Sequence, residues 1–186
     1  ATEDTMVALC SAPGRTEICG NHTDHQHGRV LAAAGNLDFL ACVALNGTSV
    51  VHFQSEGWPM TSVDLADLEV KEEEKETTAS LIRGVLAKLH KAGYPVAGFD
   101  MYVTSTVLPG SGLSSSAACE VLIGTTGNHL FCQDKFDAVE IAKIGQAAEN
   151  EYFGKPCGLM DQTASSVGDA VAIDFKDPAN PIVRSI

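Results

Sequence analysis

The feature that most constrains the fold is the alternation of strand-like and helix-like segments along the 186 residues. Apolar residues recur at helical spacing over residues 77–90, which predicts an amphipathic helix. Two further helices are expected, one beginning near Leu113 and one over residues 135–153. Strands are predicted at residues 6–10, 37–45, 49–54, 99–104, 170–175 and 182–186.

The dipeptide Asn46-Gly47 separates two of these strands and is typical of a two-residue hairpin turn, so residues 37–45 and 49–54 are predicted to pair. Because strands and helices interleave, the pattern predicts a mixed α and β class. A chain of this length fits one domain with a sizeable core. No stop signal follows the strand at residues 182–186, so we expect a truncated chain.

The composition excludes several classes of partner. A net charge of -12 argues against a nucleic-acid-binding surface. No run of about 18 apolar residues suggests a membrane span, and the N-terminus lacks the basic and apolar segments of a signal peptide, so we expect a cytoplasmic protein without a membrane partner. The six cysteines form no CxxC pair, which favours free thiols over a disulfide framework or a cysteine-rich zinc site.

A glycine- and serine-rich segment, VLPGSGLSSSAACEV at residues 107–121, suits a phosphate group. Gly110 and Gly112 leave room for backbone N–H groups to approach an anion, and three serines then open an apolar helix whose N-terminus favours negative charge. The segment matches neither a Walker P-loop, nor the dinucleotide fingerprint, nor a nucleophile elbow. By itself it is equally consistent with a turn that caps a helix.

Two acidic residues stand out further along the chain. Glu149 shares a helix face with small and apolar residues, which an ion pair, a side chain that extends to the solvent, or a divalent cation would explain. Asp161 follows the stretch GKPCGLM, where a turn or a helix N-terminus is sufficient to explain it locally.

The stretch CGNHTDHQHG at residues 19–28 gathers three histidines, an aspartate and a cysteine. Such a cluster raises the possibility of a metal site. However, all of its candidate ligands lie within one short loop, which is not the ligand spacing of a zinc site, and no cysteine pair supports one. A substrate-binding loop and an ordinary surface loop are the other interpretations.

These segments occur in an order that resembles the galactokinase branch of the GHMP small-molecule kinases. The resemblance extends from about residue 9 to about residue 175. It rests on PGSGLSSSAA, on GR-x-x-x-x-G-x-HTDH-x-x-G-x-V from Gly14, and on AEN-x-x-x-G-x-x-CG-x-MDQ from Ala148. It implies a GHMP kinase N-terminal domain over residues 1–186, an α+β fold like domain 2 of ribosomal protein S5, with a largely antiparallel sheet and helices on one side.

The resemblance also implies roles for individual residues. Asp161 matches the catalytic aspartate beside the sugar's anomeric hydroxyl, acting as general base or as electrostatic orienter, and Arg15 matches the arginine beside it. Ser116 and Glu149 match the Mg²⁺ ligands. The sugar would be held by Asn21, His22, Asp24 and Gly158. The ATP phosphates would be surrounded by Gly110, Ser111, Gly112, Leu113, Ser114, Ser115 and Ser116.

The implied activity is ATP-dependent phosphorylation of the C1 hydroxyl of galactose to galactose 1-phosphate. Many galactokinases carry glutamate where Asn21 stands, so a kinase for N-acetylgalactosamine, galacturonate or arabinose is an alternative. A non-catalytic galactose and ATP sensor is another, although such relatives are altered after the serine run and residues 114–118 are intact here. Family members continue into a C-terminal domain that this chain lacks, so we expect it to be poorly active alone.

Overall fold

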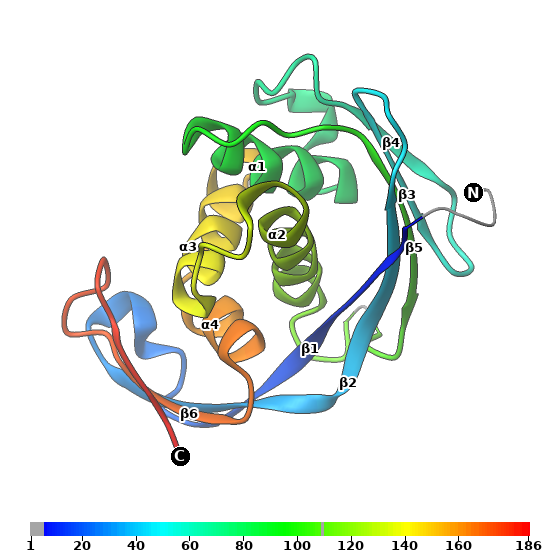
Figure 1. Cartoon of the computed structure of the whole chain (residues 1–186). Helices are drawn as coiled ribbons and strands as arrows, with labels where there is room; N and C mark the ends of the chain where they lie inside the picture. The colour runs from blue at the N-terminus through cyan, green and yellow to red at the C-terminus, as the bar shows by residue number, and fades with distance from the viewer. Residues whose placement is uncertain (1–5, 109) are drawn as a thin grey trace.

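The computed structural model describes residues 6–108 and 110–186, and Pro109 of the glycine- and serine-rich segment lies outside them. Within the described residues the chain forms one seven-stranded sheet and four α-helices (Figure 1). The strands are β1 (Ala8–Cys19), β2 (Arg29–Leu45), β3 (Val50–Ser55), β4 (Thr61–Asp64), β5 (Phe99–Ser105), β6 (Ala170–Asp174) and β7 (Ile182–Ser185). The α-helices are α1 (Thr78–Lys91), α2 (Ser115–Cys132), α3 (Ala138–Ala148) and α4 (Met160–Val167).

Three short helical turns complete the elements. Two are 3-10 turns, η1 (Thr23–Gln26) and η2 (Glu72–Glu74), and the third is a π-helix, η3 (Glu149–Phe153), which continues α3 without a break. π-turns inside helices are uncommon and occur frequently at functional sites. The π-helix here begins at Glu149, one of the predicted site residues.

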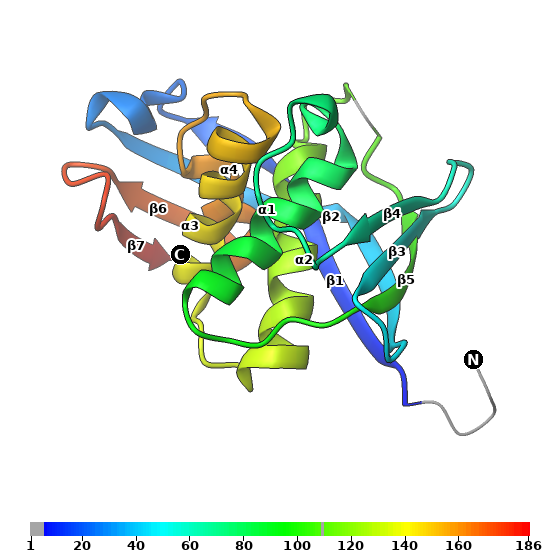
Figure 2. The ribbon, with the colours of Figure 1, turned by 90° about the horizontal axis from the view of Figure 1, so that it is seen from above.

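The sheet is organised around the long strand β2. Strand β1 pairs along one edge of β2, while β5 pairs with the C-terminal part of the other edge and β6 with its N-terminal part. Residues 34–38 of β2 pair with neither β5 nor β6, and the register between β1 and β2 shifts there. Such irregularities bend a strand. The sheet therefore curves around the helices (Figures 1 and 2).

All four α-helices lie on the concave side of the sheet (Figure 2). Helix α2 is central, because it contacts β1, β2 and the other three α-helices. Its side chains are buried on nearly every side, including Ala118, Leu122 and Ile123, which explains why its sequence is apolar without a clear polar face. The N-terminus of this buried helix is the point at which the site described below is built.

Much of the predicted architecture is confirmed. Among the strands of the described residues only the β3–β5 pair is parallel, so the sheet is largely antiparallel with helices on one side, as the resemblance implied. Helix α1 matches the amphipathic segment predicted at residues 77–90, and its apolar positions Ile82, Val85, Leu86 and Leu89 are buried. Helix α2 and strands β5, β6 and β7 also lie where strands and a helix were predicted.

The predicted hairpin at Asn46-Gly47 is wrong. The turn is present, but β2 and β3 do not pair with each other, because β5 lies between them. Gly98, just before β5, fits inside the turn: its N–H donates to Thr48 O at 2.8 Å, and a Cβ there would stand 2.5 Å from Val50 O. The turn therefore spreads its two strands around a third one.

Other boundaries differ from prediction for local reasons. Strand β1 continues to Cys19 through Pro13 and Gly14, and β2 begins at Arg29 instead of residue 37. Helix α3 starts at Ala138 instead of residue 135, because Asp137 forms a capping box with Glu140. Strand β4 and helix α4 were not predicted.

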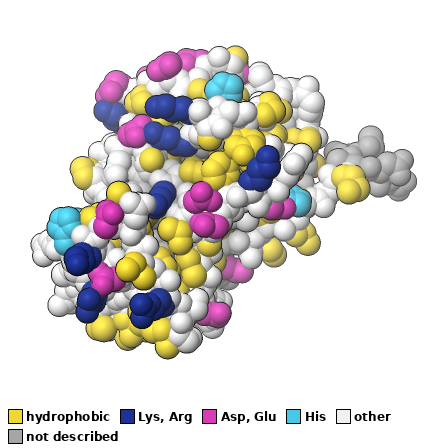
Figure 3. Space-filling model, turned by 60° about the vertical axis from the view of Figure 1, so that its left-hand side comes forward, with side chains coloured by type: hydrophobic (Ala, Val, Ile, Leu, Met, Phe, Trp, Pro, Cys, Tyr) yellow, Lys and Arg dark blue, Asp and Glu magenta, His cyan; other side chains and the backbone are white. Residues whose placement is uncertain are grey.

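Two features bear on possible partners. No helix within the described residues is long and apolar enough to cross a membrane. On the face shown in Figure 3, acidic and basic side chains are interspersed and do not gather into a patch of one sign. The six cysteines are free thiols, three of them buried: Cys10, Cys119 and Cys132.

Candidate active site

A cavity of about 390 Å³ opens at the N-terminus of α2. Its walls come from β1, from the loop before α2, from the π-helix and the loop after it, and from the first turn of α4. The lining residues are Arg15, His22, Leu108, Gly110, Ser111, Gly112, Leu113, Ser114, Ser115, Ser116, Glu149, Lys155, Cys157 and Asp161. The structure thus brings together both predicted catalytic residues, the whole predicted phosphate loop and the predicted Mg²⁺ ligands.

The loop before α2 has the backbone geometry expected of an anion-binding turn. Gly110 and Gly112 have φ angles of 76° and 78°, and Ser114, which precedes α2, has a φ angle of 55°. Glycine adopts this left-handed conformation at little cost, whereas serine does so rarely. The left-handed Ser114 leads directly into α2, whose first-turn N–H groups have no partner within the helix. Those N–H groups and the helix dipole favour a bound anion.

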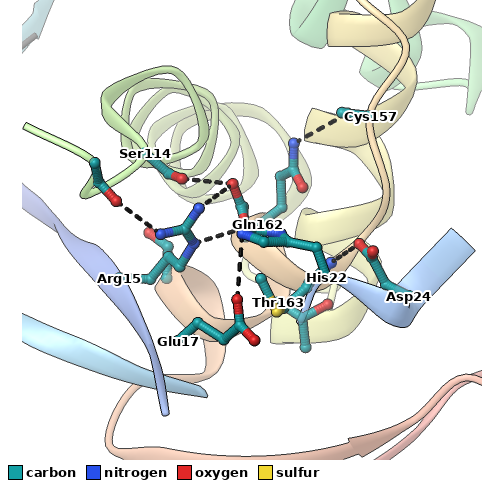
Figure 4. Close-up of polar contacts among 12 residues, drawn as sticks. Arg15, Glu17, His22, Asp24, Ser114, Cys157, Gln162 and Thr163 are labelled. Atoms are coloured by element: carbon teal, nitrogen blue, oxygen red, sulfur yellow. Dashed lines mark hydrogen bonds and ion pairs between the residues drawn. The ribbon is translucent and has the colours of Figure 1, made fainter. Parts of the chain in front are cut away.

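Arg15 and Asp161 form a bidentate ion pair in the cavity lining. The guanidinium donates from Nε to Asp161 Oδ1 at 2.6 Å and from Nη2 to Oδ2 at 2.7 Å. Its Nη1 donates to Gly112 O at 2.9 Å, so the arginine also holds the phosphate loop. Ser114 Oγ donates to the same Asp161 carboxylate, and Figure 4 shows Arg15 and Ser114 converging from two separate elements.

The irregularity in β1 brings Arg15 to this position. Gly14 lies so close to the loop before α2 that a Cβ on it would stand 3.0 Å from Leu113 O. The Arg15 N–H donates to that same carbonyl oxygen at 3.0 Å. A side chain at position 14 would push β1 away from the loop, so the glycine preceding Arg15 is required by this close approach.

Asp161 remains ionised in this setting. Burial alone raises the pKa of its carboxyl group, but the hydrogen bonds from Arg15 and Ser114 and the charge of Arg15 outweigh burial, and the net pKa lies below the ordinary value of 3.8. The side chain of Arg15 is 8% exposed and that of Asp161 is 28% exposed. The pair is therefore a mostly buried, mutually neutralising unit with one face open to the cavity.

Glu149 has very different surroundings, although it also lines the cavity. Its Oε1 accepts a hydrogen bond from Ser116 Oγ at 3.1 Å, and its Oε2 accepts one from Gln162 Nε2 at 2.9 Å. Among the described residues no lysine or arginine is paired with it, although its residue is only 3% exposed. Hydroxyl and carboxylate oxygens are what Mg²⁺ takes from proteins, and few protein ligands suffice when phosphates supply others. Ser116 and Glu149 therefore fit this ion chemically.

Glu120 is a second buried carboxyl group beside Glu149, and the sequence analysis did not identify it. It is fully buried, and Gln162 Nε2 donates to its Oε2 at 3.0 Å. Burial and the nearby charge of Glu149 raise the pKa of Glu120 well above its usual range. Gln162 belongs to the MDQ segment, but the sequence predicted no role for it.

The loop predicted to hold the sugar is strained. Gly20, Asn21 and His22 have successive φ angles of 121°, 55° and 51°. Non-glycine residues in this region cost energy and are found where the surrounding structure enforces them. Glu17 enforces it here: its carboxylate accepts the Asn21 backbone N–H and lies 3.3 Å from His22 Nε2 (Figure 4).

Asp24 and Gly158, both predicted to hold the sugar, lie side by side but outside the lining of the cavity. Asp24 is 6% exposed, and its Oδ2 accepts the Met160 backbone N–H at 3.1 Å. A Cβ on Gly158 would stand 1.7 Å from that same oxygen. Neither residue, nor Asn21, contributes to the lining of the cavity, whereas His22 does.

The three histidines of this loop face different partners. His22 approaches Glu17, His25 approaches Asp24 Oδ1 at 3.3 Å, and His27 approaches Lys176 O at 3.2 Å. In the described part of the chain, no group of three or more histidine, cysteine, aspartate or glutamate side chains is arranged to hold a metal ion.

Sequence reasoning missed several residues of the cavity and its surroundings. Lys155 and Cys157 line the cavity and lie in the GKPCG segment, for which only Gly158 was predicted to have a role. Lys155 adds a positive charge to the cavity lining. Glu17 could have been found as an acidic residue at strand spacing from Arg15, since alternate residues of a strand share a face.

Comparison with known proteins gives a consistent result. Residues 80–169 match the family model of the GHMP kinases N terminal domain, and residues 2–45 match the galactokinase galactose-binding signature. The crystal structure of Lactococcus lactis galactokinase complexed with galactose superposes with a TM-score of 0.86 at 28% identity, over 97% of this chain and 47% of that one. The chain belongs to the GHMP kinase family, whose N-terminal domain it carries.

Within that family the similarity is to galactokinases. The galactokinase of Clostridium tetani is 37% identical over 84% of this chain and 40% of its own length. That of Streptomyces coelicolor is 34% identical over 90% of this chain and 44% of its own length. The chain thus spans less than half the length of these curated relatives.

Proposed function

We propose that this chain is the sugar- and nucleotide-binding N-terminal part of an ATP-dependent galactose 1-kinase. One observation carries the proposal: the Arg15–Asp161 pair and the N-terminus of α2 open into the same cavity. Phosphoryl transfer requires mainly that donor and acceptor be positioned and that charge be stabilised. A cavity with an anion-binding end beside a fixed carboxylate meets both requirements.

The phosphates of ATP would occupy the loop from Gly110 to Ser116. The left-handed glycines and the first-turn N–H groups of α2 support this assignment, and Lys155 adds a positive charge to the lining of the same cavity. Ser116 and Glu149 would hold Mg²⁺. When bound, the ion would neutralise charge on the phosphate oxygens.

Galactose would bind with its C1 hydroxyl toward Asp161. Both oxygens of this carboxylate already accept hydrogen bonds from Arg15, and its pKa is lowered, so it is a weak base at neutral pH. We therefore assign Asp161 the electrostatic role of orienting the hydroxyl, with Arg15 stabilising charge on the phosphoryl group. The C1 oxygen forms the new bond to the γ-phosphorus as the bond to ADP breaks, and the hydroxyl proton passes to a phosphoryl oxygen and from there to water.

Sugar recognition would fall to Asn21, His22, Asp24 and Gly158. The galactose-binding signature covers the first three of them, and the structural relative from Lactococcus lactis was solved with galactose. A rigid loop of short polar side chains discriminates between sugars, because a wrong epimer leaves buried polar groups unpaired. The contacts of the Glu17 carboxylate with the Asn21 N–H and with His22 support such rigidity.

We further propose that a C-terminal domain completes the enzyme and that the 186-residue chain alone turns over poorly. The partial coverage of the curated galactokinases, 40% and 44%, supports this. Ordinary turnover by the isolated chain would contradict it.

The test is a phosphoryl-transfer assay of the full-length protein with ATP, Mg²⁺ and a panel of galactose, N-acetylgalactosamine, galacturonate and arabinose. Galactose is expected to give the highest kcat/KM. Asp161→Ala should lower kcat at least about 100-fold, the scale of losing one preorganised electrostatic group. A protein that binds galactose and ATP without transferring phosphate would instead be a sensor, and a preference for another sugar would revise the substrate.

A further inference from the structure

Gln162 lies at the centre of a buried polar cluster that the mechanism above does not use. The residue is fully buried in α4, one position after Asp161. Its Nε2 donates to Glu149 Oε2 at 2.9 Å and to Glu120 Oε2 at 3.0 Å. A longer contact, 3.6 Å, joins Nε2 to Cys157 Sγ (Figure 4). An amide nitrogen has two hydrogens, so the two carboxyl groups use its full donor capacity.

We call Glu120, Gln162 and Glu149 the carboxyl bracket. Its members come from α2, from α4 and from the π-helix after α3, so the carboxyl bracket connects three helices, and Glu149 extends it to the cavity lining. Room for it is provided by Gly145 of α3, where a Cβ would stand 3.2 Å from Glu120 Oε2 and 3.4 Å from Gln162 Cγ.

The carboxyl bracket lowers the stability of the core relative to apolar side chains. Among the described residues, Glu120 Oε1 and Gln162 Oε1 are both buried without a hydrogen-bond partner. Unpaired buried oxygens cost free energy, and apolar side chains of similar shape would stabilise the domain better. Its presence beside the cavity therefore calls for a reason other than stability.

The two oxygens of Glu149 face different ways. Oε2 is committed to Gln162, whereas Oε1 is directed to Ser116, and both Glu149 and Ser116 line the cavity. We propose that Gln162, itself held by Glu120, is a positioning residue that fixes Oε2 so that Oε1 alone is presented, with the Ser116 hydroxyl, to a divalent cation. This inference rests on the proposed function, since it concerns the cation of that same site.

The test compares Gln162→Met with Thr163→Val in the full-length protein. Both residues are fully buried in α4, and both changes remove side-chain hydrogen bonds with little change in volume. Gln162→Met removes the bonds to both carboxyl groups, whereas Thr163→Val removes the bond that the Thr163 hydroxyl donates to Leu159 O at 2.7 Å. The readout is binding of Mn²⁺ as a probe for Mg²⁺, followed by its electron paramagnetic resonance signal in the presence of a non-hydrolysable ATP analogue. Thermal unfolding is measured in parallel.

Gln162→Met should weaken Mn²⁺ binding roughly 10- to 100-fold, as losses of an orienting partner behind a metal ligand do. Thr163→Val should lower thermal stability but leave Mn²⁺ affinity near that of the wild type. If Gln162→Met does not fold, Gln162→Asn serves instead, because the shorter amide cannot reach both carboxyl groups.

Equal Mn²⁺ affinity in Gln162→Met and the wild type would overturn the inference. A third variant, Glu149→Gln, separates that failure from failure of the proposed function. If Glu149→Gln weakens Mn²⁺ binding and the Gln162 variants do not, the cation site stands and the positioning role falls. If Glu149→Gln has no effect, the proposed cation site itself is wrong.

Discussion

Asp161 and Glu149 lie on the wall of one cavity, yet the protein treats their charges in opposite ways. Asp161 is paired with a guanidinium on both oxygens, and its pKa is lowered. Glu149 is paired with a hydroxyl and an amide and has a second buried carboxyl group, Glu120, as a neighbour. The charge of Asp161 is balanced by Arg15, whereas no positively charged side chain among the described residues balances that of Glu149. The first fits a fixed electrostatic role and the second fits a cation ligand.

The largest expected effect comes from removing the positive charge that balances Asp161. Arg15→Met removes the partner of a mostly buried carboxylate, so the free energy of unfolding should fall by about 3 kcal/mol, as measured by urea denaturation. Arg29→Met is the control, because Arg29 is 82% exposed and pairs with Asp174 at the surface. Equal losses in the two variants would show that Arg15 is not a buried compensating charge.

A smaller effect tests whether Asp24, through its contact with the start of α4, helps to position Asp161 and Gln162. Gly158→Ala places a Cβ within 1.7 Å of Asp24 Oδ2, which anchors the start of α4 at Met160. Displacing that anchor moves Asp161 and Gln162 as one unit, at a cost of about 2 kcal/mol for overpacking. The midpoint temperature of thermal unfolding should fall, and the KM for galactose should rise.

Gly35→Ala provides the matched control for this substitution, because a Cβ there meets its nearest atom, Gly14 O, at an ordinary 3.4 Å. A KM for galactose in Gly158→Ala equal to that of Gly35→Ala would mean that Asp24 does not link the sugar loop to α4.

The smallest effect sharpens the comparison through pH. The pKa of Asp161 is lowered in the folded state, so its ion pair stabilises the protein above the ordinary value of 3.8, and this stabilisation is lost as the pH falls through the lowered pKa. Urea midpoints measured from about pH 5 down to about pH 2 should therefore decline more steeply in the wild type than in Asp161→Asn. Parallel curves would contradict a lowered pKa.

The sequence predicted those elements whose formation depends on residues close together in the chain. The apolar spacing of α1 and the glycine- and serine-rich start of α2 could be read from the sequence, because each depends on neighbours within a few residues. Helix α4 could not, since it has eight residues and buries the polar side chains Gln162, Thr163 and Ser165. The pairing of β5 between β2 and β3 depends on contacts about fifty residues apart, and a turn dipeptide does not report them.

The site divides in the same way. Arg15, Asp161 and the phosphate loop belong to motifs, and the resemblance pointed to them before their geometry was known. Glu120 and Gln162 are 42 positions apart and meet only because α2 and α4 pack together. Their polar character looked unremarkable in the sequence, because the burial that makes it costly is a property of the tertiary structure.

The π-helix at Glu149–Phe153 makes the spacing of the chain at this point as important as its composition. A π-turn holds about one residue more than an α-turn, so if the same five residues were wound as an α-helix with none removed, everything beyond them would be rotated by roughly 100°. Tyr152, whose hydroxyl group donates to Leu68 O at 2.9 Å, would lose that partner. The π winding therefore sets the direction in which the chain leaves this helix toward Lys155 and Cys157 of the cavity lining.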